Sequence, residues 1–186
     1  SIEQFKKYNF KATMNMAVCF AEGYVAEWQE MFSTGFFDLG SHSYNHAGIY
    51  NNKINESSFL KDVDKAHYWY MARFKGQQIL TFATPNGATG KDTANFVNDL
   101  MMGGRSGGQA GTYCDPDTLT SRETWGNMPS YIAYATTKFE GTSSNDGVSY
   151  KGAIDYLSSK KLWTVECIHT IHTGATSESD IAGDKF

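Results

Sequence analysis

Residues 36–46 read FFDLGSHSYNH, an apolar stretch that runs directly into a polar one. The apolar residues predict a short β-strand, and the polar residues predict the loop in which this strand ends. Two of the five histidines of the chain, His42 and His46, lie in this loop. Histidines four residues apart project from the same side of a helical turn, so both rings can reach one metal ion. The alternative is that the pair caps a helix or bonds to loop carbonyls.

The sequence on both sides of this stretch alternates between strand-like and helix-like patterns. Residues 10–18 alternate in polarity as a β-strand does, and residues 58–74 place apolar side chains at helical spacing. This alternation predicts an α/β fold with mainly parallel strands, either open or closed into a barrel. The other expected helices are residues 2–8, 21–34 (stopped by Gly35), 93–102 and 150–158, and the other expected strands are residues 36–39, 78–83 and 162–171.

Folds of this kind place their chemistry in the loops that follow the carboxyl ends of the strands. Three polar stretches occupy such positions: the loop with His42 and His46, residues 85–87, and the pair His169 and His172. We therefore expect these stretches to converge on one edge of the sheet. Because His169 and His172 have opposite parity in a strand, only one of them should face the site.

The composition excludes several classes of function. A net charge of −4 and an isoelectric point near 5.7 argue against a nucleic-acid partner, because phosphate contacts need clustered Lys and Arg. No apolar stretch is long enough to cross a bilayer. The chain has three cysteines and no Cys-x-x-Cys unit, which argues against a disulfide framework. A single disulfide bond between two of the three remains an alternative. Cys19 and Cys167 lie in apolar, strand-like stretches, where cysteine packs as a small hydrophobic residue.

Taken with its surroundings, the histidine stretch resembles a known motif. GSHSYNH at residues 40–46 resembles the histidine motif of the polysaccharide deacetylases, the carbohydrate esterases with a nodulation-factor deacetylase homology domain. FKKYNFKAT at residues 5–13 is similar to the family's helix into its second strand. Residues 83–87 (ATPNG) lie where the family often has Arg-Pro-Pro-Tyr-Gly; the Pro and the last Gly match, and the Arg and Tyr do not. Residues 163–171 resemble the strand that ends in the family's last histidine.

The resemblance implies a distorted (β/α) barrel with parallel strands that removes acetyl groups from N- or O-acetylated poly- or oligosaccharides. It also implies a divalent metal, zinc first, with cobalt or nickel as alternatives, held by an Asp and two His. On this reading His42 and His46 are the metal ligands. His169 is the general acid that protonates the departing amine or alcohol.

Two further side chains are candidates for the site. Arg105, in a Gly-rich stretch, has a guanidinium that suits orienting a carboxylate, in place of the Arg missing before Pro85. The alternative is that Arg105 is a solvated loop cation. The Asp that the resemblance implies as a third metal ligand has not yet been assigned. Asp38 is a candidate for it, because Asp38 and His42 lie on the same face of an extended strand.

The sequence also departs from the family pattern. The family's first strand carries an Asp-Asp pair that supplies a base and a metal ligand, and this chain has no Asp-Asp dipeptide. We therefore expect residues 1–186 to form a single polysaccharide-deacetylase-like domain that is partial at both ends, lacking the first strand and the C-terminal end. Two imidazoles alone should then bind metal poorly. The alternative is a catalytically inactive relative that binds carbohydrate or acts as a scaffold. Only the resemblance favours a secreted or cell-surface location.

Overall fold

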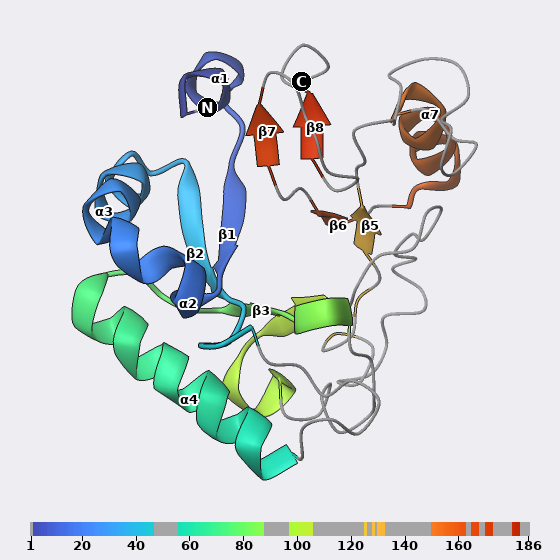
Figure 1. Cartoon of the computed structure of the whole chain (residues 1–186). Coiled ribbons are helices and arrows are strands. Elements are labelled where there is room, and N and C mark those ends of the chain that lie inside the picture. The colour runs from blue at the N-terminus through green and yellow to red at the C-terminus, as the bar shows by residue number, and fades with distance from the viewer. Residues whose placement is uncertain are drawn as a thin grey trace.

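A computed structural model describes residues 2–46, 56–87, 97–105, 125, 128, 130–132, 150–162, 165–167, 170–172 and 180–182. In chain order its elements are α1 (Ile2–Tyr8), β1 (Ala12–Met16), α2 (Val18–Ala21), the 3-10 turn η1 (Glu22–Tyr24), α3 (Val25–Ser33), β2 (Phe37–Ser41), α4 (Glu56–Arg73), β3 (Thr81–Ala83), the 3-10 turn η2 (Pro85–Gly87), β4 (Gly103–Arg105), β5 (Ser130–Ile132), α7 (Tyr150–Lys160), β6 (Val165–Cys167), β7 (Thr170–His172) and β8 (Asp180–Ala182). From α1 to β3 its helices and strands alternate, as the sequence predicts, whereas among the described residues β6, β7 and β8 follow α7 without a further helix (Figure 1).

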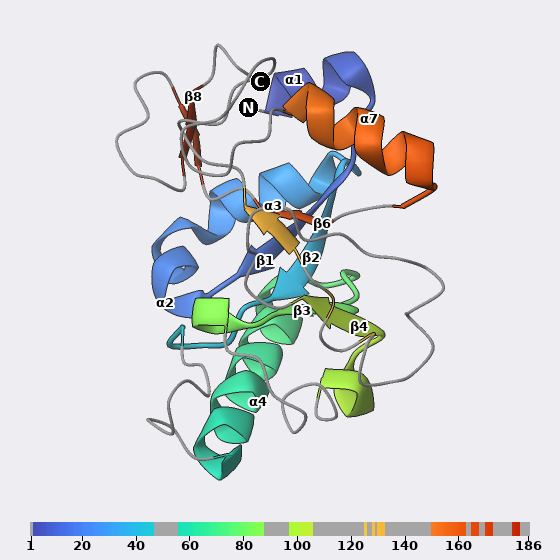
Figure 2. The same cartoon turned by 90° about the vertical axis from the view of Figure 1, so that its right-hand side faces the viewer.

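The first four strands form one sheet in the order β1-β2-β3-β4, and every pairing in it is parallel. Two smaller parallel sheets pair β5 with β6 and β7 with β8. Figure 2 shows β1 and β2 running side by side toward β3 and β4. The predicted α/β class with parallel strands is confirmed. Across the described ranges the strands lie in three separate sheets, which fits the expected incomplete barrel.

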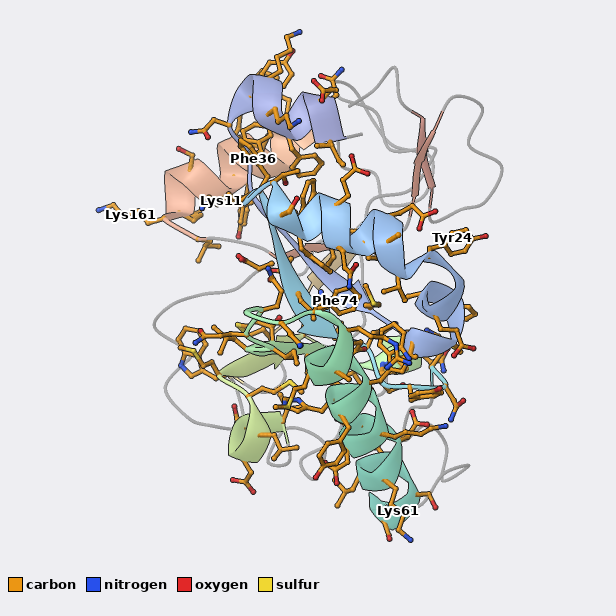
Figure 3. The ribbon with its side chains drawn as sticks, turned by 90° about the vertical axis from the view of Figure 1, so that its left-hand side faces the viewer. Lys11, Tyr24, Phe36, Lys61, Phe74 and Lys161 are labelled. Carbon is orange, nitrogen blue, oxygen red and sulfur yellow. The ribbon has the colours of Figure 1, made fainter. Side chains whose placement is uncertain are left out.

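One face of the four-stranded sheet is apolar and is covered by α1, α3 and α4. Leu39 and Phe82 on this face are each 1 % exposed. The Phe59 ring of α4 lies 5.8 Å from that of Phe82, centroid to centroid, and the Phe32 ring of α3 lies 5.3 Å from Phe74. Figure 3 shows Phe74 where the chain leaves α4 beside the sheet. The predicted apolar stripe of α4 is confirmed, since all of its members are buried: Phe59, Val63, Ala66, Tyr70 and Phe74.

Several predicted boundaries are corrected by the structure. The strand expected at residues 10–18 is limited to Ala12–Met16, because Val18 already begins α2. The helix expected at residues 21–34 is divided into α2, η1 and α3. Gly35, with φ of 74°, follows α3 as predicted, because glycine accepts this left-handed conformation at little cost.

The strand expected at residues 162–171 is also wrong as a single element. β6 pairs with β5, whereas β7 pairs with β8, so the segment contributes two strands to two different sheets. The argument that His169 and His172 have opposite parity assumed one continuous strand. It therefore does not choose between them.

A buried tyrosine ties α4 to the ends of the strands. Tyr70 is 0 % exposed, and its hydroxyl donates a short hydrogen bond to the carbonyl of Met16 and lies 3.5 Å from that of Ser43. Burial raises the pKa of Tyr70 to about 12, because the phenolate would lose its hydration. Met16 ends β1, and Ser43 lies in the loop that follows β2, residues 42–46, which we call the histidine loop. A single hydroxyl therefore contacts both segments.

We predict that Tyr70→Phe lowers the free energy of unfolding by about 1 kcal/mol, the net value of a buried hydrogen bond. Because the folded-state pKa lies above the unfolded value of about 10, the tyrosine stabilises the fold below pH 10 and loses this contribution as the pH rises toward 12. The variant should lack this part of the alkaline loss. Denaturant unfolding at several pH values measures both effects. Tyr68→Phe, at a 74 % exposed position of the same helix, is the control and should leave stability unchanged.

Candidate functional site

The carboxyl ends of the four parallel strands lie at one edge of the sheet. The amide of His42, directly after β2, donates to the Met16 carbonyl at the end of β1 (2.9 Å). On the other side, the amide of Thr84 donates to the carbonyl of Arg105 at the end of β4 (2.9 Å). This edge therefore brings together the histidine loop, the start of the Pro85–Gly87 turn and Arg105.

The structure places His42 and His46 next to each other. Their ring centroids are 4.7 Å apart, with an angle of 70° between the ring planes. The predicted reason for this proximity is wrong, because residues 42–46 are not helical. The loop instead turns back on itself through two left-handed residues, Ser43 (φ 67°) and His46 (φ 55°).

The hydrogen bond of His42 identifies which of its ring nitrogens carries a proton. Its Nδ1 lies 2.6 Å from the carbonyl oxygen of Ala83, the last residue of β3. A carbonyl oxygen can only accept, so Nδ1 carries a proton, and in the neutral imidazole Nε2 then keeps the lone pair. Metal-binding histidines commonly donate their second ring N–H to a backbone carbonyl in this way, which fixes the tautomer and the ring orientation.

The face of the sheet opposite the helices is polar around Gly40. Thr13 and Asn15 of β1, Gly40 of β2 and Thr81 of β3 share it, as the register of the strands requires. A Cβ at Gly40 would lie 2.8 Å from Thr81 Oγ1 and 2.9 Å from Thr13 Cγ2, and would overlap Asn15 Oδ1. A glycine at this position therefore allows the three polar side chains to approach one another.

Arg105 lies at the end of β4 rather than in a loop, so its interpretation as a solvated loop cation is wrong. It pairs with Ala83 in the parallel register and is half-buried. Register places Arg105 on the same polar face as Gly40. The Arg105 side chain therefore starts from the face of the sheet that carries Gly40, at the carboxyl end of β4.

Asp38 does not join the histidines. It is exposed and precedes His42 by four positions of extended chain, a separation of roughly 13 Å along the strand. Within the part of the chain that the structure describes, no group of three or more His, Cys, Asp or Glu side chains is placed to hold a metal. The suggestion that Asp38 supplies the missing ligand is therefore wrong. His169 lies outside the described residues, and His172 ends β7.

Two residues that follow β1 border the histidine loop and were not expected there. The Phe20 ring lies 5.6 Å from that of His46 and is 70 % exposed. Cys19 lies in the first turn of α2, so its placement in a strand-like stretch is wrong. Burial raises the pKa of its thiol, and the negative charge of Asp62 raises this pKa further. The raised pKa favours the neutral thiol, which is a weaker nucleophile and metal ligand than the thiolate.

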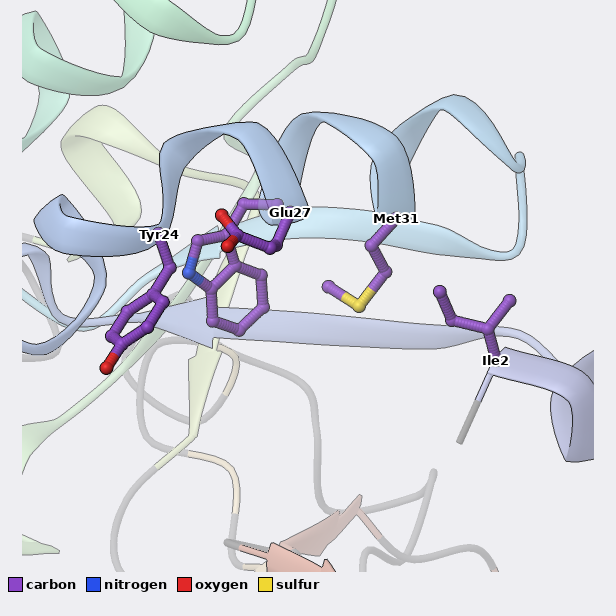
Figure 4. A pocket seen from close by; sticks show the side chains of 5 residues that line it. Ile2, Tyr24, Glu27 and Met31 are labelled. Carbon is purple, nitrogen blue, oxygen red and sulfur yellow. The ribbon is translucent and has the colours of Figure 1, made fainter.

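A separate pocket lies away from this edge. It is lined by Ile2 of α1 and by Tyr24, Glu27, Trp28 and Met31 of η1 and α3, beside β1 (Figure 4). None of the side chains predicted for the site lines it. It therefore provides no alternative location for the histidine chemistry. No helix in the described ranges is long and apolar enough to cross a membrane.

Comparison with known families identifies the class of protein. Residues 2–103, more than half of the 186-residue chain, match the polysaccharide deacetylase family. The chain therefore belongs to the polysaccharide deacetylase family. The matched segment contains the histidine loop and ends just before Arg105. A comparison with curated proteins gives no match.

Solved structures share the fold at low sequence identity. A polysaccharide deacetylase from Bacillus cereus has a TM-score of 0.54 at 17% identity, covering 66% of this chain and 37% of that one. A CE4 family pseudoenzyme from Bacillus anthracis has a TM-score of 0.51 at 16% identity, covering 89% and 56%. Puue allantoinase has a TM-score of 0.54 at 15% identity, covering 85% and 50%. The chain thus spans between about a third and somewhat over half of the length of these proteins, and the likeness establishes the fold.

We predict that Gly40→Ala destabilises the fold by about 1–3 kcal/mol, because the added methyl group meets three side chains in a packed part of the sheet. The denaturant midpoint should fall accordingly. Gly23→Ala is the matched control, since a Cβ there has no atom within 4 Å. Equal midpoints for the two variants would show that the polar face is looser than described.

Proposed function

We propose that this protein is a metal-dependent hydrolase that removes acetyl groups from N- or O-acetylated carbohydrate. Membership of the polysaccharide deacetylase family supports the class of reaction. The observation that carries the proposal is the adjacent pair of imidazoles at the carboxyl edge of the sheet, with His42 oriented by the Ala83 carbonyl. We also propose that residues 1–186 form a single domain of this family.

The donor set of the loop fits a divalent transition metal. Neutral imidazole suits zinc, nickel and cobalt better than it suits magnesium or calcium, which prefer oxygen ligands. His42 and His46 supply two nitrogens, and a catalytic zinc site uses three protein ligands. In this proposal zinc is the first candidate, cobalt and nickel are alternatives, and the third ligand comes from a residue other than Asp38.

The residues of the chain then have separate tasks. When bound, a divalent ion would supply Lewis-acid polarisation and lower the pKa of its bound water to about 7. His42 and His46 hold the ion, and Arg105 orients the substrate or a carboxylate from the polar face. His169 donates a proton to the departing amine nitrogen or alcohol oxygen as its bond to the acetyl carbon breaks. The oxygen from water leaves in acetate, and the sugar keeps its new N–H or O–H.

A second function is that of an inactive relative that binds carbohydrate or acts as a scaffold. Two observations favour it: the chain has no Asp-Asp pair, and no described carboxylate joins the histidines. A CE4 family pseudoenzyme is among the proteins that share the fold, and a mutant of it is described as having restored enzymatic activity. Binding of acetylated glycan without acetate release would support this second function.

We predict that the protein, supplied with Zn²⁺, Co²⁺ or Ni²⁺, releases acetate from N-acetylated or O-acetylated oligosaccharides, and that His42→Ala reduces this release to background. The ligand pair would be broken, and one imidazole does not hold a catalytic ion. Enzymatic detection of acetate and metal analysis of the dialysed protein measure the two effects.

His67→Ala is the control, because His67 lies in α4 and outside the histidine loop. It should retain both acetate release and metal. Acetate release by His42→Ala at the wild-type rate would refute the site. Glycan binding by a wild-type protein that releases no acetate with any of the three metals would favour the inactive relative.

A further inference from the structure

The histidine loop holds an unfavourable backbone shape. Ser43 and His46 both have positive φ, a region that residues other than Gly adopt in only a few per cent of cases, although Asn, Asp and His do so more often than the rest. Residues in such conformations persist only when the surrounding structure fixes them. The proximity of the two imidazoles therefore depends on whatever holds the loop between them.

The loop carbonyls are held by the start of α2. The amide of Val18 donates to the Ser43 carbonyl (3.3 Å), and the amide of Cys19 donates to the Tyr44 carbonyl (2.8 Å). These donors are the first backbone N–H groups of a helix, which have no partner inside the helix. Both contacts are made by backbone atoms, so they hold the loop whatever side chains α2 carries.

The loop amides are held by one side chain of α4, the carboxylate of Asp62. Its Oδ2 accepts from the amide of Tyr44 (2.9 Å) and from the amide of Asn45 (3.0 Å). Its Oδ1 accepts from the side-chain amide of Asn45 (2.5 Å). Asp62 is only 8 % exposed, so these donors replace water around a carboxylate that would otherwise be costly to bury. A second side chain of α4 adds to the contact, because Lys65 Nζ lies 3.6 Å from the centroid of the Tyr44 ring.

We propose that Asp62 is a positioning residue of the metal site: its carboxylate holds residues 44 and 45, and so sets the separation of His42 and His46. This inference rests on the proposed function, since it assigns a role within the same site. The acidic side chain is required because all of the groups that face it are donors. An amide in its place would replace one of the two acceptor oxygens by an NH₂ group, so the side chain could no longer accept on both sides, and the bonds from the loop amides would lose the assistance of the negative charge.

The first test uses the protein without metal and compares Asp62→Asn with the wild type by NMR. In the wild type, ring protons of His42 and His46 should show a nuclear Overhauser effect, because the centroids are 4.7 Å apart. The amides of Tyr44 and Asn45 should be protected from exchange by their hydrogen bonds. Asp62→Asn should lose the ring contact and expose both amides. Retention of both in the variant would overturn the proposal.

The second test is a titration with Zn²⁺, followed through the ring resonances of His42 and His46. Removal of a group that orients a metal ligand typically weakens metal binding about 10–100-fold, and we expect about 10-fold for Asp62→Asn because it acts through the backbone. Unchanged affinity would refute the role of Asp62. If even the wild-type rings did not respond to Zn²⁺, the metal site itself would be refuted, whereas the first test would still report on the loop.

Two controls separate positioning from stability. Asp64→Asn makes the same change at an exposed position two residues along α4. Val63→Ala removes a fully buried side chain beside Asp62, so it destabilises the core without touching the loop. Both should keep the ring contact and the wild-type affinity for Zn²⁺. Loss of affinity in Val63→Ala, at a temperature where the protein is folded, would show that the effect reflects stability alone and would overturn the proposal.

A milder variant covers the case in which Asp62→Asn does not fold. Asn45→Ala changes an exposed side chain and removes only the 2.5 Å hydrogen bond to Oδ1. We expect it to fold, to bind Zn²⁺ two- to three-fold more weakly and to raise exchange at residue 45. Wild-type affinity and exchange in this variant would contradict the proposal.

Discussion

The carbonyl of Met16 connects the three segments on which the rest of the structure depends. It ends β1, and it accepts hydrogen bonds from the amide of His42 and from the hydroxyl of Tyr70. The first bond extends the parallel pairing of β1 and β2 by one residue, into the histidine loop. The second brings α4 against the same point. Strand, loop and helix are thus fixed relative to one another at a single buried atom.

The two faces of the sheet have different roles because side chains alternate along each strand. The apolar face, with Leu39 and Phe82, forms the core with α3 and α4. The polar face, with Asn15 and Thr81 packed around Gly40, contributes little hydrophobic burial and carries Arg105 at the end of β4. The core therefore lies on one side of the strands and Arg105 on the other, whereas the histidine loop, at the carboxyl ends of the strands, contacts α4 on the core side.

The sequence predicted the features that depend on periodicity. The stripe of α4, the strand before the histidines and the parallel α/β class follow from the spacing of apolar residues, and all are present. The resemblance of GSHSYNH to the deacetylase motif led to the family that residues 2–103 match. Asp62 was not predicted from the sequence. It lies three residues after Phe59, on the buried side of α4, and a carboxylate on a buried helix face needs hydrogen-bond donors around it, which was the available signal.

Other features depended on contacts that no local pattern encodes. Serine and histidine do not indicate a left-handed backbone, so the shape of the loop at Ser43 and His46 was taken for a helical turn. Arg105 was assigned to a loop because glycines precede it, yet pairing with β3 draws it into a strand. The division of residues 162–171 between two sheets depends on partners far away in the sequence.

Because α2 and α4 both grip the histidine loop, an excised peptide spanning residues 40–48 would contain the imidazoles but not their arrangement. Docking of α4 should therefore be coupled to the approach of the two imidazoles, because Asp62 contacts the residues between them. A cation bound there would in turn stabilise the docked helix, by about 2.7 kcal/mol at a hundred times its dissociation constant. Binding of a cation to the two imidazoles would thus also stabilise the core that α4 forms with the sheet.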